Sequence, residues 1–167
     1  QEAARTVLER APQLRTIVRD NRAFLARAVR YLISAGLRQF LDLGSGIPTE
    51  GNVHEIAQVI APDSRVVYVD LDPVAVAESL ELLDGNPRAT AVLADLRSPP
   101  DVLGHSTVRR LLDFAEPTAV ILASVLHFVS DDELAYAAVQ QYVDALAPGG
   151  YLVVSHAATE SFAPGGE

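Results

Sequence analysis

The sequence predicts an α/β domain with a doubly wound, mostly parallel sheet, preceded by a helical extension. Three observations support this fold class. Short, continuously apolar runs recur along the chain, stretches with helical spacing separate them, and a turn with two glycines follows the first run. Continuous apolar strands are typical of a parallel sheet that helices cover on both faces. With 167 residues, 49% of them hydrophobic, the chain can build one domain around a sizeable core.

The first strong element is a long amphipathic helix predicted over residues 12–35, after a shorter helix over residues 2–10. Gly36 suits the C-cap of the long helix. Its arginines, Arg22 among them, are expected on the solvent side, whereas Asn21 falls on the apolar stripe. There Asn21 either hydrogen-bonds across the packed interface or points at a ligand. The apolar residues at helical spacing are Leu14, Ile17, Val18, Leu25, Ala28, Val29 and Leu32.

Strands and helices then alternate to the end of the chain. The predicted strands are Gln39–Leu43, Val66–Val69, Ala91–Ala94, Ala119–Ala123 and Tyr151–Ser155. The predicted helices are Val53–Ile60, Pro73–Leu83, Pro100–Phe114 and Asp131–Leu146. We expect residues 1–37 to be a helical extension that covers the sheet or closes the strand ends as a lid. Residues 38–167 are expected to be the ligand-binding part of a single compact domain.

Composition limits the classes of partner. The net charge is −9, and residues 1–38 hold eight arginines against three acidic residues, so the remainder is strongly acidic. An acidic body disfavours nucleic acid, which needs a basic surface, and the arginine-rich start is expected to be a solvated helix face. The chain has no cysteine and no apolar run near membrane-span length. These features favour a cytoplasmic protein that binds a small molecule and neither nucleic acid nor a membrane.

Acidic residues lie at or just after the end of each of the first three predicted strands. Asp42 precedes the two glycines, Asp70 ends the second strand, and Asp95 follows the third. In open parallel sheets, ligands bind outside the carboxyl ends of the strands, near the switch in strand order. The three carboxylates are therefore expected at one ligand site.

A nicotinamide dinucleotide fits this site poorly. Its G-x-G-x-x-G fingerprint needs a third glycine where this chain has Thr49, and nearby carboxylates would repel a pyrophosphate. S-adenosylmethionine (SAM) fits better, because it carries a sulfonium cation and no phosphate. Asp70 follows Gly46 by 24 residues, close to the spacing of an acid that accepts from ribose hydroxyls. Gly44 and Gly46 would let the backbone approach the ligand.

Further contacts with the cofactor follow from the same geometry. Asp95 is expected to accept from the adenine amino group, the Leu96 backbone N–H to reach a ring nitrogen, and Leu71 to cover a face of the ring. Asp72 and Asp131 are expected to cap the helices that follow them. The residues predicted to bind the cofactor are Asp42, Gly44, Ser45, Gly46, Asp70, Leu71, Asp95, Leu96 and Ser124.

Several motifs in order carry a family resemblance. Asp42-Leu43-Gly44-Ser45-Gly46, Asp70, Ala94-Asp95-Leu96 and Leu146-Ala147-Pro148-Gly149-Gly150-Tyr151 resemble the motifs of Rossmann-like, class I SAM-dependent methyltransferases. Asn21-Arg22-Ala23-Phe24-Leu25, residues 48–55, Ala94-Asp95-Leu96-Arg97 and Val125-Leu126-His127-Phe128-Val129 resemble a bacterial family of predicted SAM methyltransferases of unknown function. Pro48 stands in place of the third motif glycine. Members of that family extend past both ends of this chain, so two further strands and part of the substrate pocket are expected outside it.

The resemblance implies a methyltransferase that acts on an unidentified, small-molecule acceptor. The candidates for a catalytic base are His54, His127 and His156. Asn21 and Asn52, together with His54 and His127, are the candidates on the substrate side. No metal site is expected, because no histidines have ligand spacing. A non-catalytic domain that senses SAM or S-adenosylhomocysteine (SAH) remains an alternative, and an NAD-dependent oxidoreductase is a weaker one.

Overall fold

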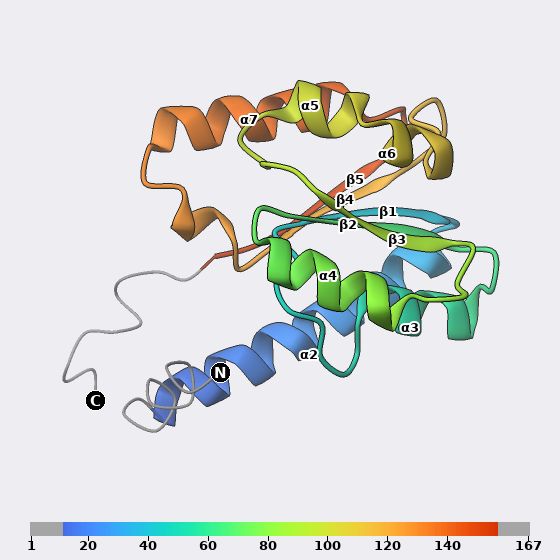
Figure 1. The fold of residues 1–167 in the computed structure, drawn as a ribbon, viewed down its shortest axis with the longest axis horizontal. Coiled ribbons are helices and arrows are strands. Elements are labelled where there is room, and N and C mark those ends of the chain that lie inside the picture. Colours follow the sequence, from blue (N-terminus) through green and yellow to red (C-terminus); the bar gives the residue numbers. More distant parts are fainter. Residues whose placement is uncertain (1–11, 157–167) are drawn as a thin grey trace.

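The computed structural model describes residues 12–156, with side chains from residue 16 (Figure 1). The predicted helix over residues 2–10 lies outside the described residues. In chain order the elements are α2 (Pro12–Ser34), β1 (Gln39–Leu43), α3 (Val53–Ile60), β2 (Arg65–Asp70), α4 (Pro73–Leu82), β3 (Ala89–Leu93), α5 (Pro99–Gly104), α6 (Ser106–Leu111), β4 (Ala119–Ala123), the 3-10 helix η1 (Leu126–Phe128), α7 (Asp132–Asp144) and β5 (Tyr151–Ser155).

The five strands form one parallel sheet in the order β3-β2-β1-β4-β5. The chain builds outward from β1 to β3 and then returns to place β4 on the other side of β1. The strand order therefore switches between β1 and β4, beside the loop with the two glycines. This arrangement confirms the predicted doubly wound α/β fold, and it places the loop where such sheets bind ligands.

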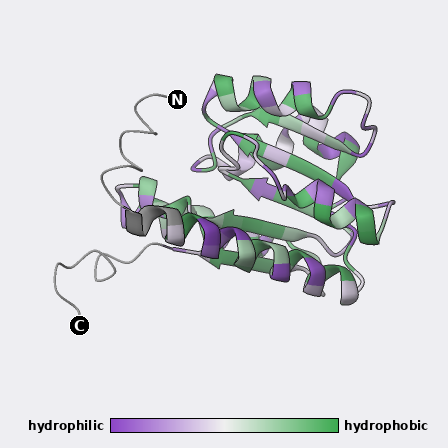
Figure 2. Ribbon diagram, turned by 90° about the horizontal axis from the view of Figure 1, so that it is seen from below, coloured by the Kyte–Doolittle hydropathy of each residue, from purple (hydrophilic) through white to green (hydrophobic). Residues whose placement is uncertain are grey.

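Helices cover both faces of the sheet, as Figure 1 shows, with α2, α3 and α4 on one side and α5, α6 and α7 on the other. The strands are hydrophobic over most of their length, whereas α2 alternates polar and apolar turns (Figure 2). Alternate residues of each strand therefore enter two separate cores. Phe40, Val66 and Ile121 pack under α2 and α3, while Leu41 and Val67 pack under the other layer.

Helix α2 has two parts with different surroundings. Its second half packs against the sheet and α3, and Val29, Leu32 and Ile33 are buried there. Its first half extends past the sheet on the side where β5 ends (Figure 1). Val18, expected on the buried stripe, is 55% exposed, because this part of the helix has no sheet beneath it.

Two predicted elements are wrong in detail. The helix predicted over 100–114 is two short helices, α5 and α6, because His105 has extended backbone angles. Its Nδ1 accepts from the N–H of Thr107, so His105 caps α6 instead of lying within a helix. Strand β3 begins at Ala89, two residues earlier than predicted, since the small and polar pair Ala89 and Thr90 carries little apolar signal.

The predicted helix caps are confirmed. Asp72 accepts from the N–H of Val74 at 2.8 Å, and Asp131 accepts from the N–H of Leu134 at 3.1 Å. Both carboxylates satisfy a free N–H in the first turn of a helix. Within residues 12–156, no helix has the length and apolarity needed to cross a membrane.

Candidate functional site

Two hollows meet at the glycine loop, residues 44–52, which joins β1 to α3. The first, which we call the inner cavity, is about 80 Å³, and its polar lining residues are Asn21, Arg22, Asp42, Ser45, Asn52, His54, Tyr68 and Ser79. The second, which we call the outer cleft, is about 560 Å³, and its lining includes Asp70, Leu71, Asp95, Leu96, Ser124 and Phe128. Gly44 and Gly46 line both. The predicted cofactor residues are thus divided between two neighbouring spaces.

Backbone hydrogen bonds hold the glycine loop against the end of β2. The N–H groups of Gly44 and Ser45 donate to the carbonyl of Val69 at 2.8 and 3.2 Å. The N–H of Gly46 donates to Oδ2 of Asp70 at 2.7 Å. The loop is therefore positioned before any ligand arrives, and Asp70 is part of what positions it.

The two glycines serve different purposes. Both have positive φ, +70° at Gly44 and +66° at Gly46, a region that favours glycine. A Cβ at Gly44 would lie 2.1 Å from Cγ2 of Val125, whereas a Cβ at Gly46 would meet nothing within 4 Å. Gly44 is therefore required for packing against the segment after β4. At Gly46 the backbone faces open space, as a ligand contact requires.

The rest of the loop forms a capping box at the start of α3. Glu55 accepts from the N–H groups of Gly51 and Asn52, both at 2.8 Å. The Asn52 side chain donates to the carbonyl of Thr49 at 2.5 Å and accepts from its N–H at 3.3 Å. These bonds fix the turn that follows Pro48. Asn52, a predicted substrate-side residue, lines the inner cavity with its amide already engaged by the loop.

Asp42 lies inside β1, with its carboxylate buried at the floor of the inner cavity. It is 7% exposed, and among the described residues no hydrogen bond or ion pair reaches its carboxylate. Burial raises its pKa to about 7, an effect that Arg22 opposes and Asp70 reinforces. A carboxylate buried without partners is costly, so this position is suited to a cationic group of a ligand.

Tyr68 pairs with Asp42 in strand register and anchors His54. The Tyr68 hydroxyl accepts from the backbone N–H of His54 at 2.9 Å and lies 2.8 Å from its Nδ1. Burial lowers the pKa of His54, partly offset by Glu55, and burial raises the pKa of Tyr68. Both rings are therefore held neutral at the wall of the cavity.

Helix α2 also lines the inner cavity, through Asn21, Arg22 and Leu25. Oδ1 of Asn21 accepts from the hydroxyl of Ser155 at 2.5 Å, so the first interpretation of Asn21 is confirmed: its side chain bonds across the packed interface. Asn21 also lines the inner cavity, and its contact with a ligand stays a prediction. Arg22, expected on the solvent side, instead lies close enough to Asp42 to influence its pKa. Sequence spacing missed it because the apolar stripe is no guide where the helix passes beyond the sheet.

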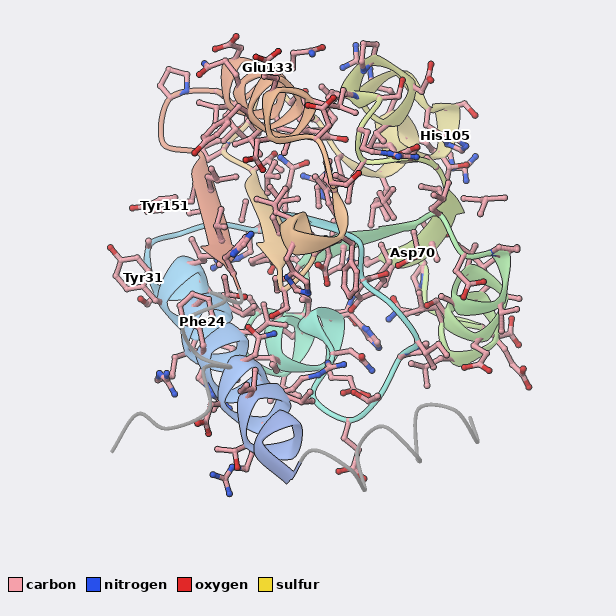
Figure 3. The ribbon with its side chains drawn as sticks, turned by 90° about the vertical axis from the view of Figure 1, so that its left-hand side faces the viewer. Phe24, Tyr31, Asp70, His105, Glu133 and Tyr151 are labelled. Carbon is pink, nitrogen blue, oxygen red and sulfur yellow. The ribbon has the colours of Figure 1, made fainter. Side chains whose placement is uncertain are left out.

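Asp70 stands at the end of β2, where the outer cleft begins (Figure 3). Besides accepting from Gly46, its carboxylate accepts from the N–H of Asp72 at 2.9 Å through Oδ1. These bonds fix the orientation of the carboxylate, and each oxygen keeps a further lone pair for a ligand donor. Two vicinal hydroxyls are a suitable partner for such a group.

Asp95 faces the same cleft, but its carboxylate is paired with an arginine side chain. The side chain of Arg97 donates to both of its oxygens, at 2.9 Å and 3.0 Å from Nε and 2.5 Å from Nη2. These bonds lower the pKa of Asp95. The carbonyl of Leu96 accepts from the hydroxyl of Tyr142 at 3.0 Å, which fixes the backbone on which the predicted adenine contacts depend.

The apolar part of the cleft is exposed. Leu71 is 59% exposed and Phe128 is 79% exposed, and both line the cleft. Ser124, which lines the same cleft, has φ +54°, a left-handed conformation rare outside glycine. Its N–H donates to the carbonyl and hydroxyl oxygens of Ser155, each at 3.0 Å. Exposed apolar side chains beside fixed carboxylates suit a flat, partly polar ring system.

His127 and His156 come together although 29 positions separate them in the sequence. They follow β4 and β5, and their ring centroids are 5.7 Å apart at nearly a right angle. Burial, with a contribution from His156, lowers the pKa of His127. The third candidate, His54, lies in the inner cavity, so the three predicted histidines do not form one cluster. The described residues include no group of three or more potential metal ligands.

Comparison with known proteins points in one direction. A sequence profile described as S-adenosyl methyltransferase matches residues 1–165. The chain is similar to a protein from Thermobifida fusca YX assigned as a methyltransferase (45% identity, TM-score 0.86, 91% of this chain and 59% of that one). It is also similar to a DUF574 family protein from Streptomyces avermitilis MA-4680 (42% identity, TM-score 0.82, 90% and 59%).

A more distant likeness shows the fold alone. The N-methyltransferase NodS from Bradyrhizobium japonicum WM9 is 20% identical, with a TM-score of 0.55 over 80% of this chain and 65% of that one. No curated protein matches the chain significantly. The chain spans 59% of the length of each of the two more similar structures.

Proposed function

Because the chain belongs to the S-adenosyl methyltransferase family, whose cofactor is SAM, we propose that it transfers a methyl group from SAM to a small-molecule acceptor. The chain spans 59% of the length of each of its two more similar relatives, so its activity and its acceptor are both part of this proposal. The observation that carries it is the pre-oriented carboxylate of Asp70, bonded to Gly46 at the topological switch point of the sheet.

The residues present fit SAM. The space in front of Gly46 is open, and the exposed apolar surface of Leu71 and Phe128 suits an adenine ring. The buried carboxylate of Asp42 suits a positively charged group. In this arrangement Asp70 accepts from the ribose hydroxyls, and Asp95 accepts from the adenine amino group through the lone pairs that Arg97 leaves free. The cofactor thus crosses the glycine loop from the outer cleft to the inner cavity.

When bound, SAM supplies a methyl group on a sulfonium, and the lone pair of an acceptor displaces it while the C–S electron pair returns to sulfur. The chain contributes mainly position: it must hold the acceptor in line with the methyl carbon and sulfur. His127 lies after β4, beside Phe128 of the outer cleft, with His156 next to it. Its lowered pKa keeps it neutral, as a group that accepts a proton from a hydroxyl or amine must be.

The class of acceptor follows from charge. The region after residue 38 carries nineteen acidic residues against five arginines, which disfavours a polyanionic acceptor. A small neutral or cationic molecule is therefore the preferred substrate. Asn21 and the histidine pair are the described side chains proposed to face it.

Calorimetry on the full-length protein tests the proposal. We expect micromolar binding of SAM and SAH and no binding of NAD. Asp70→Asn keeps the shape of the side chain and removes the charge, so SAH affinity should fall by about 1–3 kcal/mol. Asp84→Asn, an exposed aspartate at the far end of α4, is the matched control and should change nothing.

Failure of the wild-type protein to bind SAM or SAH would overturn the proposal. If Asp70→Asn and Asp84→Asn bind SAH equally, Asp70 is not the ribose ligand. Turnover on a panel of small hydroxyl, amine and thiol acceptors then separates an enzyme from a non-catalytic SAH sensor.

A further inference from the structure

The chain turns in an unusual conformation where β4 ends, just before the segment that carries His127. Ser124 has φ +54°, and it is the only residue of 12–156 other than glycine with a positive φ. An L-residue adopts this left-handed region at a cost, so the conformation persists only where neighbouring groups hold it. Val125, the next residue, is buried against Gly44. The turn at Ser124 therefore decides the direction in which the chain continues to His127.

Ser155, the last residue of β5, holds this turn from the neighbouring strand. The N–H of Ser124 donates to both the carbonyl and the hydroxyl oxygen of Ser155, each at 3.0 Å. The Ser155 hydroxyl has one proton, which it donates to Oδ1 of Asn21 at 2.5 Å. A chain of hydrogen bonds therefore runs from β4 through β5 to α2. It needs a hydroxyl at position 155 and an acceptor at position 21.

Two of the candidate bases lie close to this chain of bonds. His156 follows Ser155 directly, and His127 comes three residues after Ser124. The backbone between Ser124 and the end of η1 is itself bonded as a single helical turn. The ring centroids of the two histidines are 5.7 Å apart, at an angle of 84°. Each ring is thus attached to one side of the contact between Ser124 and Ser155, so a change in that contact alters how the two rings meet.

We propose that Asn21 and Ser155 are positioning residues for the methyl transfer. Their hydrogen bonds hold the turn at Ser124, and this turn sets how His127 lies against His156. The inference rests on the proposed function, which assigns the base to His127. It explains why a polar residue lies on the apolar stripe of α2: Oδ1 of Asn21 accepts the Ser155 proton, which leaves a lone pair of that hydroxyl for the N–H of Ser124. It also connects the helix before the first strand to the acceptor side of the cleft.

Titration of the histidine rings by NMR tests the inference on the full-length protein, without cofactor or acceptor. Burial, with a contribution from His156, lowers the pKa of His127 below its ordinary value of 6.5. Ser155→Ala and Asn21→Leu each break the chain of bonds, so the His127 pKa should rise toward 6.5 as the two rings separate. Ser155→Thr keeps the hydroxyl and should keep the wild-type pKa. Ser130→Ala, which changes an exposed serine nearer to His127 in the sequence, is the matched control.

Two further measurements separate positioning from a general loss of stability. In the double variant of Asn21→Leu and Ser155→Ala, the pKa shift should equal the larger single shift, because both substitutions break one chain of bonds. On any hydroxyl, amine or thiol acceptor that the wild type methylates, kcat should fall by about tenfold or more in each single variant. The acid limb of the kcat/KM profile should move with the His127 pKa. Ser155→Cys, a weaker donor, should give a smaller shift of the same sign.

An unchanged His127 pKa in both Ser155→Ala and Asn21→Leu would overturn the inference. An equal pKa shift in Ser155→Thr or Ser130→Ala would do the same, because the hydroxyl of Ser155 would then not be the cause. A shifted pKa beside an unchanged kcat would remove the positioning role. Each of these results leaves the proposed function standing. If the wild-type protein bound neither SAM nor SAH, the proposed function would fall and the positioning role with it, whatever the titration shows.

Discussion

The inner cavity and the outer cleft share the glycine loop, but they hold their carboxylates in opposite ways. In the outer cleft, Asp70 accepts two backbone N–H groups and Asp95 accepts from Arg97, so both are stabilised before a ligand arrives. In the inner cavity, Asp42 is buried without a described partner, and its pKa is raised to about 7. The difference indicates where a ligand must bring charge: the satisfied carboxylates of the outer cleft suit a neutral group, and the unsatisfied carboxylate of Asp42 suits a cation.

Substitution of Gly44, which lines both the inner cavity and the outer cleft, gives the largest expected loss of stability. Gly44→Ala places a Cβ 2.1 Å from Cγ2 of Val125 in a left-handed conformation, so the protein should lose about 2–5 kcal/mol of stability. Gly46→Ala has a similar φ and open space around its Cβ, so it should lose only about 1–2 kcal/mol. Urea denaturation measures the free energy of unfolding of both variants. Equal losses would mean that Val125 moves aside and that its contact with Gly44 is not rigid.

A single substitution at Asp42 should raise the stability of the free protein and lower its affinity for SAH. Asp42→Asn removes a buried charge, so the free protein should become more stable at pH 8. Because burial raises the pKa of Asp42 from 3.8 to about 7, the gain is at most about 4 kcal/mol. The same variant should bind SAH about 10–100-fold more weakly. Thermal denaturation and calorimetry check the two halves, with Asp84→Asn as the control. A variant that is less stable at pH 8 would show that Asp42 supports the fold.

The pH dependence should be confined to the inner cavity. Asp42 ordinarily titrates near 3.8 and in the fold near 7, so the folded protein keeps a proton between these values. Its contribution to stability is present below about pH 4 and is lost as pH rises through 7. An ammonium needs the charged form, so SAH affinity should fall as pH drops from 7, by up to about tenfold per unit. The affinity for 5′-methylthioadenosine, which shares the adenosine and thioether of SAH but lacks the amino-acid group, should stay constant. Parallel pH profiles for the two ligands would show that Asp42 does not bind the ammonium group.

The outer cleft was the more predictable of the two regions. Asp70 and Asp95 follow apolar strands directly, and the carboxyl ends of parallel strands meet at one edge, so chain position alone brought them together. The two glycines were equally visible, but only the fold shows that Gly44 makes room for Val125. That contact joins segments far apart in the sequence, which spacing cannot reveal.

The inner cavity was harder to foresee, because it is built between layers. Tyr68 sits in an apolar strand and would be taken for core, and its bond to His54 depends on how α3 lies against β2. Arg22 carries a helical spacing typical of a solvated face. The surroundings of Arg22 depend on where α2 extends beyond the sheet, which is a property of the tertiary structure.

A crystal structure of the full-length protein with SAH would show whether the ligand spans both the outer cleft and the inner cavity. We expect the cofactor to cross the glycine loop, with its ribose hydroxyls on Asp70 and its positively charged group at Asp42. An SAH molecule whose amino-acid group lies outside the inner cavity, with the Asp42 carboxylate still unpartnered, would contradict it.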